Sequence, residues 1–176
     1  MKERYLLIWN TVIFVIFSFL VAGMQTTFWP LLARFFEGMN LWIYLLVYAS
    51  LYRPFWHGLL FVYLNTIALH AFTNSTIGIL LLSQIIILLF CHFFRSRIFW
   101  NTLSYFMIMS AAAILLFEIS LMLLSRFFEF SPATSFPWWK MFISIIVSPL
   151  FCFLFFRTAR IIDGFLPPQQ PGAMKS

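Results

Sequence analysis

Long uncharged segments dominate this sequence and constrain its fold more than any other feature. Neither Lys, Arg, Asp nor Glu occurs between Tyr5 and Ala33 or between Pro54 and Phe94. The second segment has 41 residues and would be roughly 60 Å long as one helix, about twice the thickness of a bilayer's hydrocarbon core. It therefore predicts two membrane-spanning helices, joined by the turn-forming residues 73–76 and Gly78.

The small number of charged side chains excludes a water-soluble domain. Only 9% of the residues are charged and 63% are hydrophobic, whereas a soluble domain has about a quarter charged residues. The net charge of +6 does not indicate nucleic acid binding, because the basic residues lie singly or in pairs at the ends of apolar segments. This placement is typical of the signals that orient helices during membrane insertion.

The charge-bounded segments predict an all-α integral membrane protein, a bundle of six transmembrane helices. The expected helices lie near 5–25, 40–53, 55–72, 76–94, 98–125 and 138–157, within a transmembrane domain of residues 1–165 that precedes a disordered cytoplasmic tail, 166–176. The first apolar segment is longer than that of a cleaved signal peptide, so we interpret it as a retained helix.

Two of the expected helices have unusual lengths. Helix 40–53 would measure about 21 Å, which is short for a span. It can stand nearly upright, thin the bilayer or be buried among its neighbours. Helix 98–125 would measure about 42 Å and must tilt or project from the membrane.

Basic residues predict the orientation of the bundle. With the amino terminus in the cytoplasm, eight basic residues lie inside: Lys2, Arg4, Arg53, Arg95, Arg97, Arg157, Arg160 and Lys175. Three lie outside: Arg34, Arg126 and Lys140. This asymmetry satisfies the positive-inside rule, and six spans place both termini in the cytoplasm.

A few polar side chains fall inside the expected spans, where each needs a partner. Glu118 lies in the outer half of the fifth helix and is either protonated or paired with a polar group of another helix. It indicates a proton-linked or ligand-binding site, or a packing residue that faces the bundle. We favour packing, because no second carboxylate within the spans completes a proton relay.

The third and fourth helices carry further polar groups. Thr66 and His70 are four residues apart and share a helix face, with Asn65 beside them and Gln84 on the next helix. Together they form either a small polar pocket that opens outward or a set of interhelical hydrogen bonds, and we favour the hydrogen bonds.

No recognised catalytic or metal-binding motif is present in the sequence. HExxH, CxxC and GxSxG do not occur, and no serine has a carboxylate–histidine pair marked out to activate it. Cys91 and Cys152 lie inside apolar segments and are expected to be buried thiols. We therefore expect a protein that is not an enzyme and that holds no metal or cofactor.

The order of landmarks along residues 5–160 resembles the rod shape-determining protein MreD family. Trp29-Pro30 is similar to a family element that follows the first helix, and Asn40 to a residue that opens the second. Pro54 matches a proline in the inner turn, and Gly78 closes a small-polar turn between helices three and four. The sequence departs from the family at His70, where an aspartate is usual, and at Val62 and Thr66, where glycines are expected.

This resemblance implies a scaffold in the inner membrane of a bacterium that supports rod shape and lateral peptidoglycan synthesis. It implies association with an MreC-type bitopic protein and, through it, with MreB, RodA and the elongation transpeptidase, as well as with membrane lipid. The fold of this family is also similar to the substrate-binding subunits of energy-coupling-factor transporters. A vitamin-type transporter subunit is therefore the alternative function. A third hypothesis, a membrane enzyme acting on lipid headgroups, lacks a nucleophile and base pair.

Overall fold

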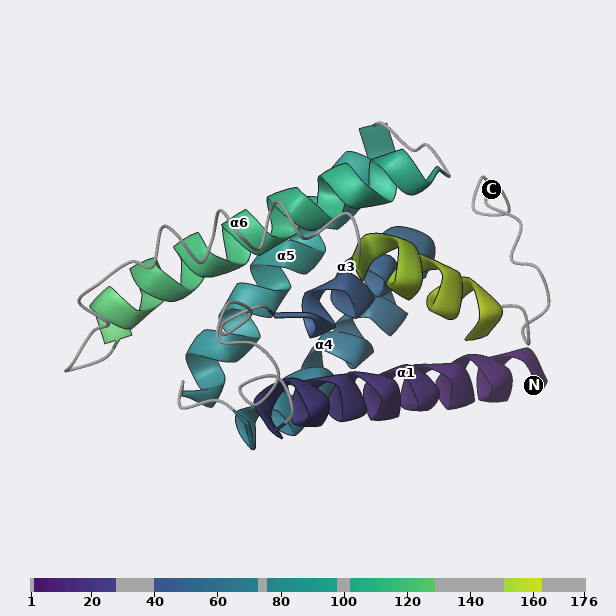
Figure 1. Cartoon of the computed structure of the whole chain (residues 1–176), viewed down its shortest axis with the longest axis horizontal. Helices are drawn as coiled ribbons and strands as arrows, with labels where there is room; N and C mark the ends of the chain where they lie inside the picture. The colour runs from purple at the N-terminus through teal and green to yellow at the C-terminus, as the bar shows by residue number, and fades with distance from the viewer. Residues whose placement is uncertain (1, 28–39, 73–75, 98–101, 129–150, 163–176) are drawn as a thin grey trace.

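The computed structural model describes residues 2–27, 40–72, 76–97, 102–128 and 151–162, and the regular structure in these ranges is entirely helical. Figure 1 shows the arrangement of the helices. The labelled helices are α1 (Lys2–Thr27), α3 (Trp42–Tyr52), α4 (Phe55–His70), α5 (Ile77–Arg97) and α6 (Leu103–Phe128). Residues 151–162 form a further helix.

Most helix boundaries lie within a few residues of those expected from the sequence, with two exceptions. α6 begins at Leu103 and ends at Phe128, rather than extending over 98–125. The last helix continues to residue 162, beyond the expected end at 157. Its expected first half, Trp29-Pro30 and the tail 166–176 lie outside the described residues.

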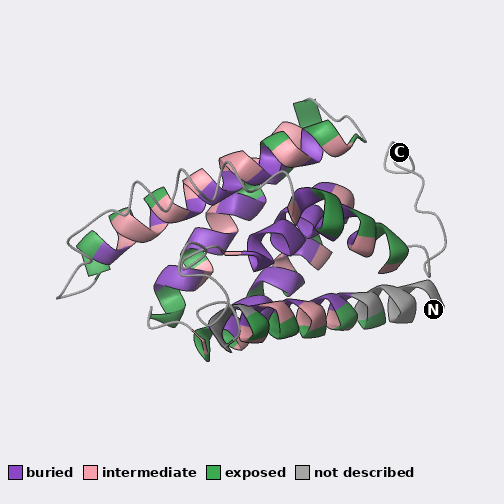
Figure 2. Cartoon of the chain, viewed as in Figure 1, coloured by how far each residue is buried: buried purple, intermediate pink, exposed green. Residues whose placement is uncertain are grey.

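Helix α3 lies at the centre of the fold. It contacts α1, α4, α5 and α6. It also contacts the helix 151–162, because the ring of Tyr44 stacks on that of Phe155 with centroids 5.3 Å apart. Every residue from Leu41 to Leu51 is buried, as the continuous purple of α3 in Figure 2 shows. Of the three possibilities for this short segment, the structure has the one in which its neighbours surround it. A helix that is apolar on all sides is suited to such a position.

Pro54 separates α3 from α4. The residue before a proline is driven to extended backbone, and Arg53 has φ −112° and ψ 161°. Proline has no N–H, so it is tolerated at a helix start, and Pro54 is the N-cap residue of α4. The single residue pair Arg53-Pro54 therefore ends one helix and begins the next.

The outer helices present apolar side chains on both of their faces. On α4, Phe61, Val62 and Leu69 are buried, while Trp56, Leu60, Tyr63 and Ile67 are exposed. Large exposed apolar side chains occur on α1, α5, α6 and 151–162 as well. Among the described helices, α5 and α6 are long and apolar enough to span a membrane.

Candidate functional site

Three polar side chains from three helices form a hydrogen-bonded chain in the core. The hydroxyl of Ser18 on α1 donates to Asn65 Oδ1 on α4 at 2.6 Å, and Asn65 Nδ2 donates to Gln84 Oε1 on α5 at 3.1 Å. All three side chains are fully buried. We call Ser18, Asn65 and Gln84 the polar triad. It ties α1 and α5 to α4.

The triad is not accessible to solvent, and one of its hydrogen-bond donors has no acceptor among the described residues. Gln84 Nε2 is buried and has no hydrogen-bond partner among the described residues. Thr66, beside Asn65, does not join the triad, because its hydroxyl donates to the carbonyl of Val62 in its own helix at 2.8 Å. Ser83 likewise donates to the carbonyl of Ile79 at 2.9 Å. Each of these hydroxyls uses its donor within its own helix and does not donate to a ligand.

Glu118 belongs to a second, separate polar contact. Its Oε1 accepts a hydrogen bond of 3.0 Å from Nδ2 of Asn40, the residue that precedes α3. Both residues are half-buried. Nearby residues on the two elements also meet: the rings of Trp42 and Phe117 pack edge to face with centroids 5.0 Å apart. Asn40 and Glu118 therefore fasten the start of α3 to α6.

His70 lies apart from the other predicted site residues. It is the last residue of α4 and is exposed. The five side chains considered from the sequence thus separate into Asn65 and Gln84 in the triad, Thr66 bonded within its helix, Glu118 with Asn40, and His70 at the surface. They do not line one common pocket.

The described residues do not assemble a recognisable reaction centre. Within the described ranges, no group of three His, Cys, Asp or Glu side chains is close enough to hold a metal ion. Cys91 and Cys152 are both buried and are not joined in a disulfide. The arrangement is chemically suited to holding helices together.

Two landmarks of the family resemblance occupy structural positions. Pro54 starts α4, and Gly78 lies in the first turn of α5, where a Cβ atom would meet nothing within 4 Å. A close approach that the sequence analysis missed involves Gly58. A Cβ atom at this position would lie 2.7 Å from Leu88 Cδ1, so α4 and α5 pack tightly here. In the sequence, the close contact was indicated only by the position of Gly58, one turn into an apolar helix.

The partners of Asn65 and Glu118 were also missed. Ser18 and Ala22, four residues apart, are both buried on the inner face of α1. That face also carries Thr11 and Phe14, so the spacing of three and four residues marks it in the sequence. Nothing in the sequence specifies which helix this face meets.

Comparisons of the chain with protein-family models, with curated proteins and with solved structures gave no match.

Proposed function

We propose that this chain is a non-enzymatic membrane scaffold of the bacterial elongation machinery, a six-span bundle in the inner membrane that binds partner transmembrane helices. Its first partner is a bitopic MreC-type protein, which links it to MreB, RodA and the elongation transpeptidase. The observation that carries the proposal is the use of the core polar groups: they are bonded to one another and hold helices together, while the outer faces offer apolar side chains.

Embedding in a bilayer is supported by the exposed apolar surface. Large exposed patches of this kind are unusual on soluble monomers and mark membrane or partner contacts. On α4 the exposed Trp56, Leu60, Tyr63 and Ile67 recur at spacings of four, three and four residues. They form one stripe along the helix, which suits contact with lipid tails or with another transmembrane helix.

The direction of the helices is compatible with two cytoplasmic termini. Gly23 near the end of α1 lies beside Phe72 after α4, and Phe55 at the start of α4 lies beside His92 near the end of α5. α1 and α4 therefore run in the same direction, and α5 runs in the opposite one. This is the alternation that six spans with an inside amino terminus require.

The family resemblance supports the choice of the elongation machinery among scaffold functions. Asn40, Pro54 and Gly78 each stand at the beginning of a helix. Residues in such places determine where each span starts. A scaffold needs its spans positioned in this way, whatever side chains it presents to its partners.

The transporter alternative requires a cavity that opens outward and is lined by polar groups. The expected lining was Glu118, His70, Asn65 and Gln84. Asn65 and Gln84 are fully buried and bonded to each other. A ligand would have to break this contact and separate α4 from α5. The geometry therefore favours the scaffold.

Depletion in the native cell is the direct test. We expect rod-shaped cells to become round, and a tagged protein to co-purify with a bitopic MreC-type partner. Glu118→Gln should preserve rod shape, because the amide oxygen still accepts the hydrogen bond from Asn40. Cells that stay rod-shaped after depletion, or recovery of paired ATPases in place of the bitopic protein, would contradict the proposal.

A further inference from the structure

Two helices of the bundle carry stripes of exposed side chains with the same spacing. In each stripe a tryptophan is followed by exposed residues at intervals of four, three and four. The α1 stripe consists of Trp9, Ile13, Ile16 and Leu20, and the α4 stripe of Trp56, Leu60, Tyr63 and Ile67. The stripes differ in chemistry at the third position, where Ile16 is 54% exposed and Tyr63 is 55% exposed. The α4 stripe therefore has a hydroxyl where the α1 stripe is purely apolar.

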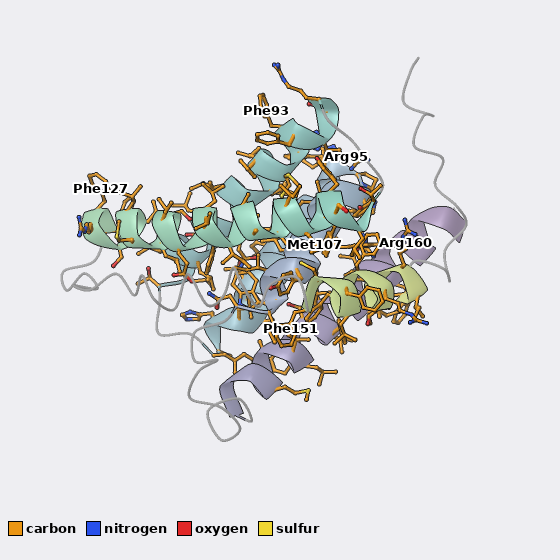
Figure 3. The ribbon with its side chains drawn as sticks, turned by 45° about the horizontal axis from the view of Figure 1, so that its top comes forward. Phe93, Arg95, Met107, Phe127, Phe151 and Arg160 are labelled. Carbon is orange, nitrogen blue, oxygen red and sulfur yellow. The ribbon has the colours of Figure 1, made fainter. Side chains whose placement is uncertain are left out.

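Tyr63 lies near the middle of α4, far from both ends of the helix. α4 begins at Phe55, close to Arg95 of α5, whose guanidinium donates to the carbonyl of Arg53. Figure 3 shows Arg95 on the opposite side of the molecule from Phe127, near the end of α6. Tyr63 is the ninth of the sixteen residues of α4, so it lies about 10–12 Å along the helix from either end. In the proposed topology, its side chain is therefore within the hydrocarbon layer.

The Tyr63 hydroxyl is poorly suited to contact with lipid tails. It has no hydrogen-bond partner among the described residues, and an acyl chain has no acceptor to offer. A hydroxyl left unpaired in an apolar environment costs free energy. Tryptophan and tyrosine on lipid-facing surfaces belong at the headgroup level, which Trp56 at the start of α4 satisfies and Tyr63 does not. The α4 stripe is therefore suited to a protein surface that supplies a polar group at this depth.

We propose that the α4 stripe is the interface of a parallel dimer and that its occupant is the α4 stripe of a second copy of this chain. The asymmetry of basic residues orients every copy in the same way. A two-fold axis along the membrane normal then places each residue of one stripe at the depth of the same residue in the other. Tyr63 faces Tyr63 of the second copy, and because a hydroxyl is both donor and acceptor, the two groups are complementary.

The apolar members of the α4 stripe suit close pairing of two helices. Intervals of four and three residues are those of the a and d positions of a heptad. Side chains at these positions interlock between helices that cross at about +20°, the common geometry of membrane bundles. Leu60 and Ile67, on either side of Tyr63, would pack against their counterparts and exclude lipid from the hydroxyl pair.

A second copy is favoured over a different partner because of this complementarity. In a second copy, Tyr63 itself supplies the acceptor at the required depth, whereas no feature of this chain specifies an acceptor on another protein. The dimer rests on the membrane embedding described under the proposed function. It is independent of the elongation partners proposed there.

Cysteine cross-linking compares the two stripes. Leu60 and Ile13 hold the same place in their stripes, so L60C and I13C are matched variants that both keep Tyr63. Cys91 and Cys152 are buried, and the unmodified chain gives the background. The full chain is oxidised with copper phenanthroline in native membranes, and the products are separated by non-reducing electrophoresis. We expect L60C to form a disulfide-linked dimer and I13C to stay at the background.

Removal of the hydroxyl measures its contribution to the dimer. Y63F keeps the ring and should weaken dimerisation about threefold to fifteenfold, the loss expected for one interhelical hydrogen bond. I16A, at the corresponding position of the α1 stripe, should leave dimerisation unchanged. The dimer fraction is measured by single-molecule photobleaching of labelled full chain in liposomes at increasing lipid dilution.

Other outcomes would overturn the dimer. Equal self-linking of L60C and I13C would indicate random collision, and single photobleaching steps at every lipid dilution would indicate a monomer. Dimerisation of Y63F as tight as that of the unmodified chain would remove the role of the hydroxyl pair. A disulfide between L60C and a different protein, in place of a second copy, would assign the α4 stripe to a partner helix. A failure of the scaffold hypothesis would appear in the cell-shape assay and leave the dimer fractions unchanged.

Discussion

Asn65 is the residue on which the interior of this protein most depends. It accepts from Ser18 and donates to Gln84, so three helices share one amide. Interhelical hydrogen bonds in membranes contribute about 0.6 kcal/mol on average and up to about 1.7 kcal/mol. The sequence indicated that Asn65 and Gln84 needed partners, because polar groups in a span are costly. The contribution of Ser18 became clear only from the packing of α1 on α4.

Replacement of Asn65 should therefore destabilise the bundle. We expect Asn65→Leu to reduce the free energy of unfolding by about 1–3 kcal/mol, since Ser18 and Gln84 both lose a partner. Thermal unfolding in detergent measures the change. Thr66→Val is the matched control: it removes a neighbouring buried hydroxyl whose bond is within α4, and it should cost less than about 1 kcal/mol. Equal losses in the two variants would show that the triad has no special role.

Between helices, the closest approach lies where α4 meets α5. Gly58 and Gly78 are both in helices of this pair, yet only Gly58 has a neighbouring side chain within van der Waals distance of a Cβ atom, at Leu88. The turn before Gly78 was predictable from its small polar residues. The crowding at Gly58 was not, because it depends on the angle and register of two packed helices.

A large side chain distinguishes these two glycines. Gly58→Leu should force α4 and α5 apart and destabilise the protein by about 1–3 kcal/mol or more. Gly78→Leu should be neutral or slightly stabilising, because the position is open and leucine favours a helix more than glycine does. Both are measured by the detergent-solubilised unfolding midpoint and by the yield of folded protein. A neutral Gly58→Leu variant would contradict the tight packing.

Across the whole protein, a short central helix is surrounded by longer ones whose outer faces are apolar. Large apolar side chains are exposed on the outer helices, where a soluble protein has mostly polar ones, and the core is largely apolar as well. The six-span topology with both termini in the cytoplasm remains our prediction for this arrangement. It places the ends of α3 and α5, with Arg53 and Arg95, on the cytoplasmic side and the end of α6 outside.

Accessibility of engineered cysteines tests that topology. Cys91 and Cys152 are buried, so the background labelling should be low. In intact cells, an impermeant maleimide should label Phe127→Cys, whose parent side chain is 82% exposed at the end of α6. It should label Ser96→Cys, at the end of α5, only after the membrane is permeabilised. The reverse pattern, or labelling of both in intact cells, would exclude the proposed orientation.

The sequence by itself determined that the protein is helical and where most of the described helices approximately lie. Charge-free segments, turn formers and Pro54 act locally, and each can be recognised without knowledge of the fold. Only the tertiary structure decided that α3 is the enclosed helix, that Ser18 reaches Asn65, that Asn40 meets Glu118, and that Arg95 caps α3. In a chain this apolar, nearly every helix face is suitable for burial. The periodicity of the sequence therefore cannot rank the possible helix pairings, and the fit of the side chains between helices selects one of them.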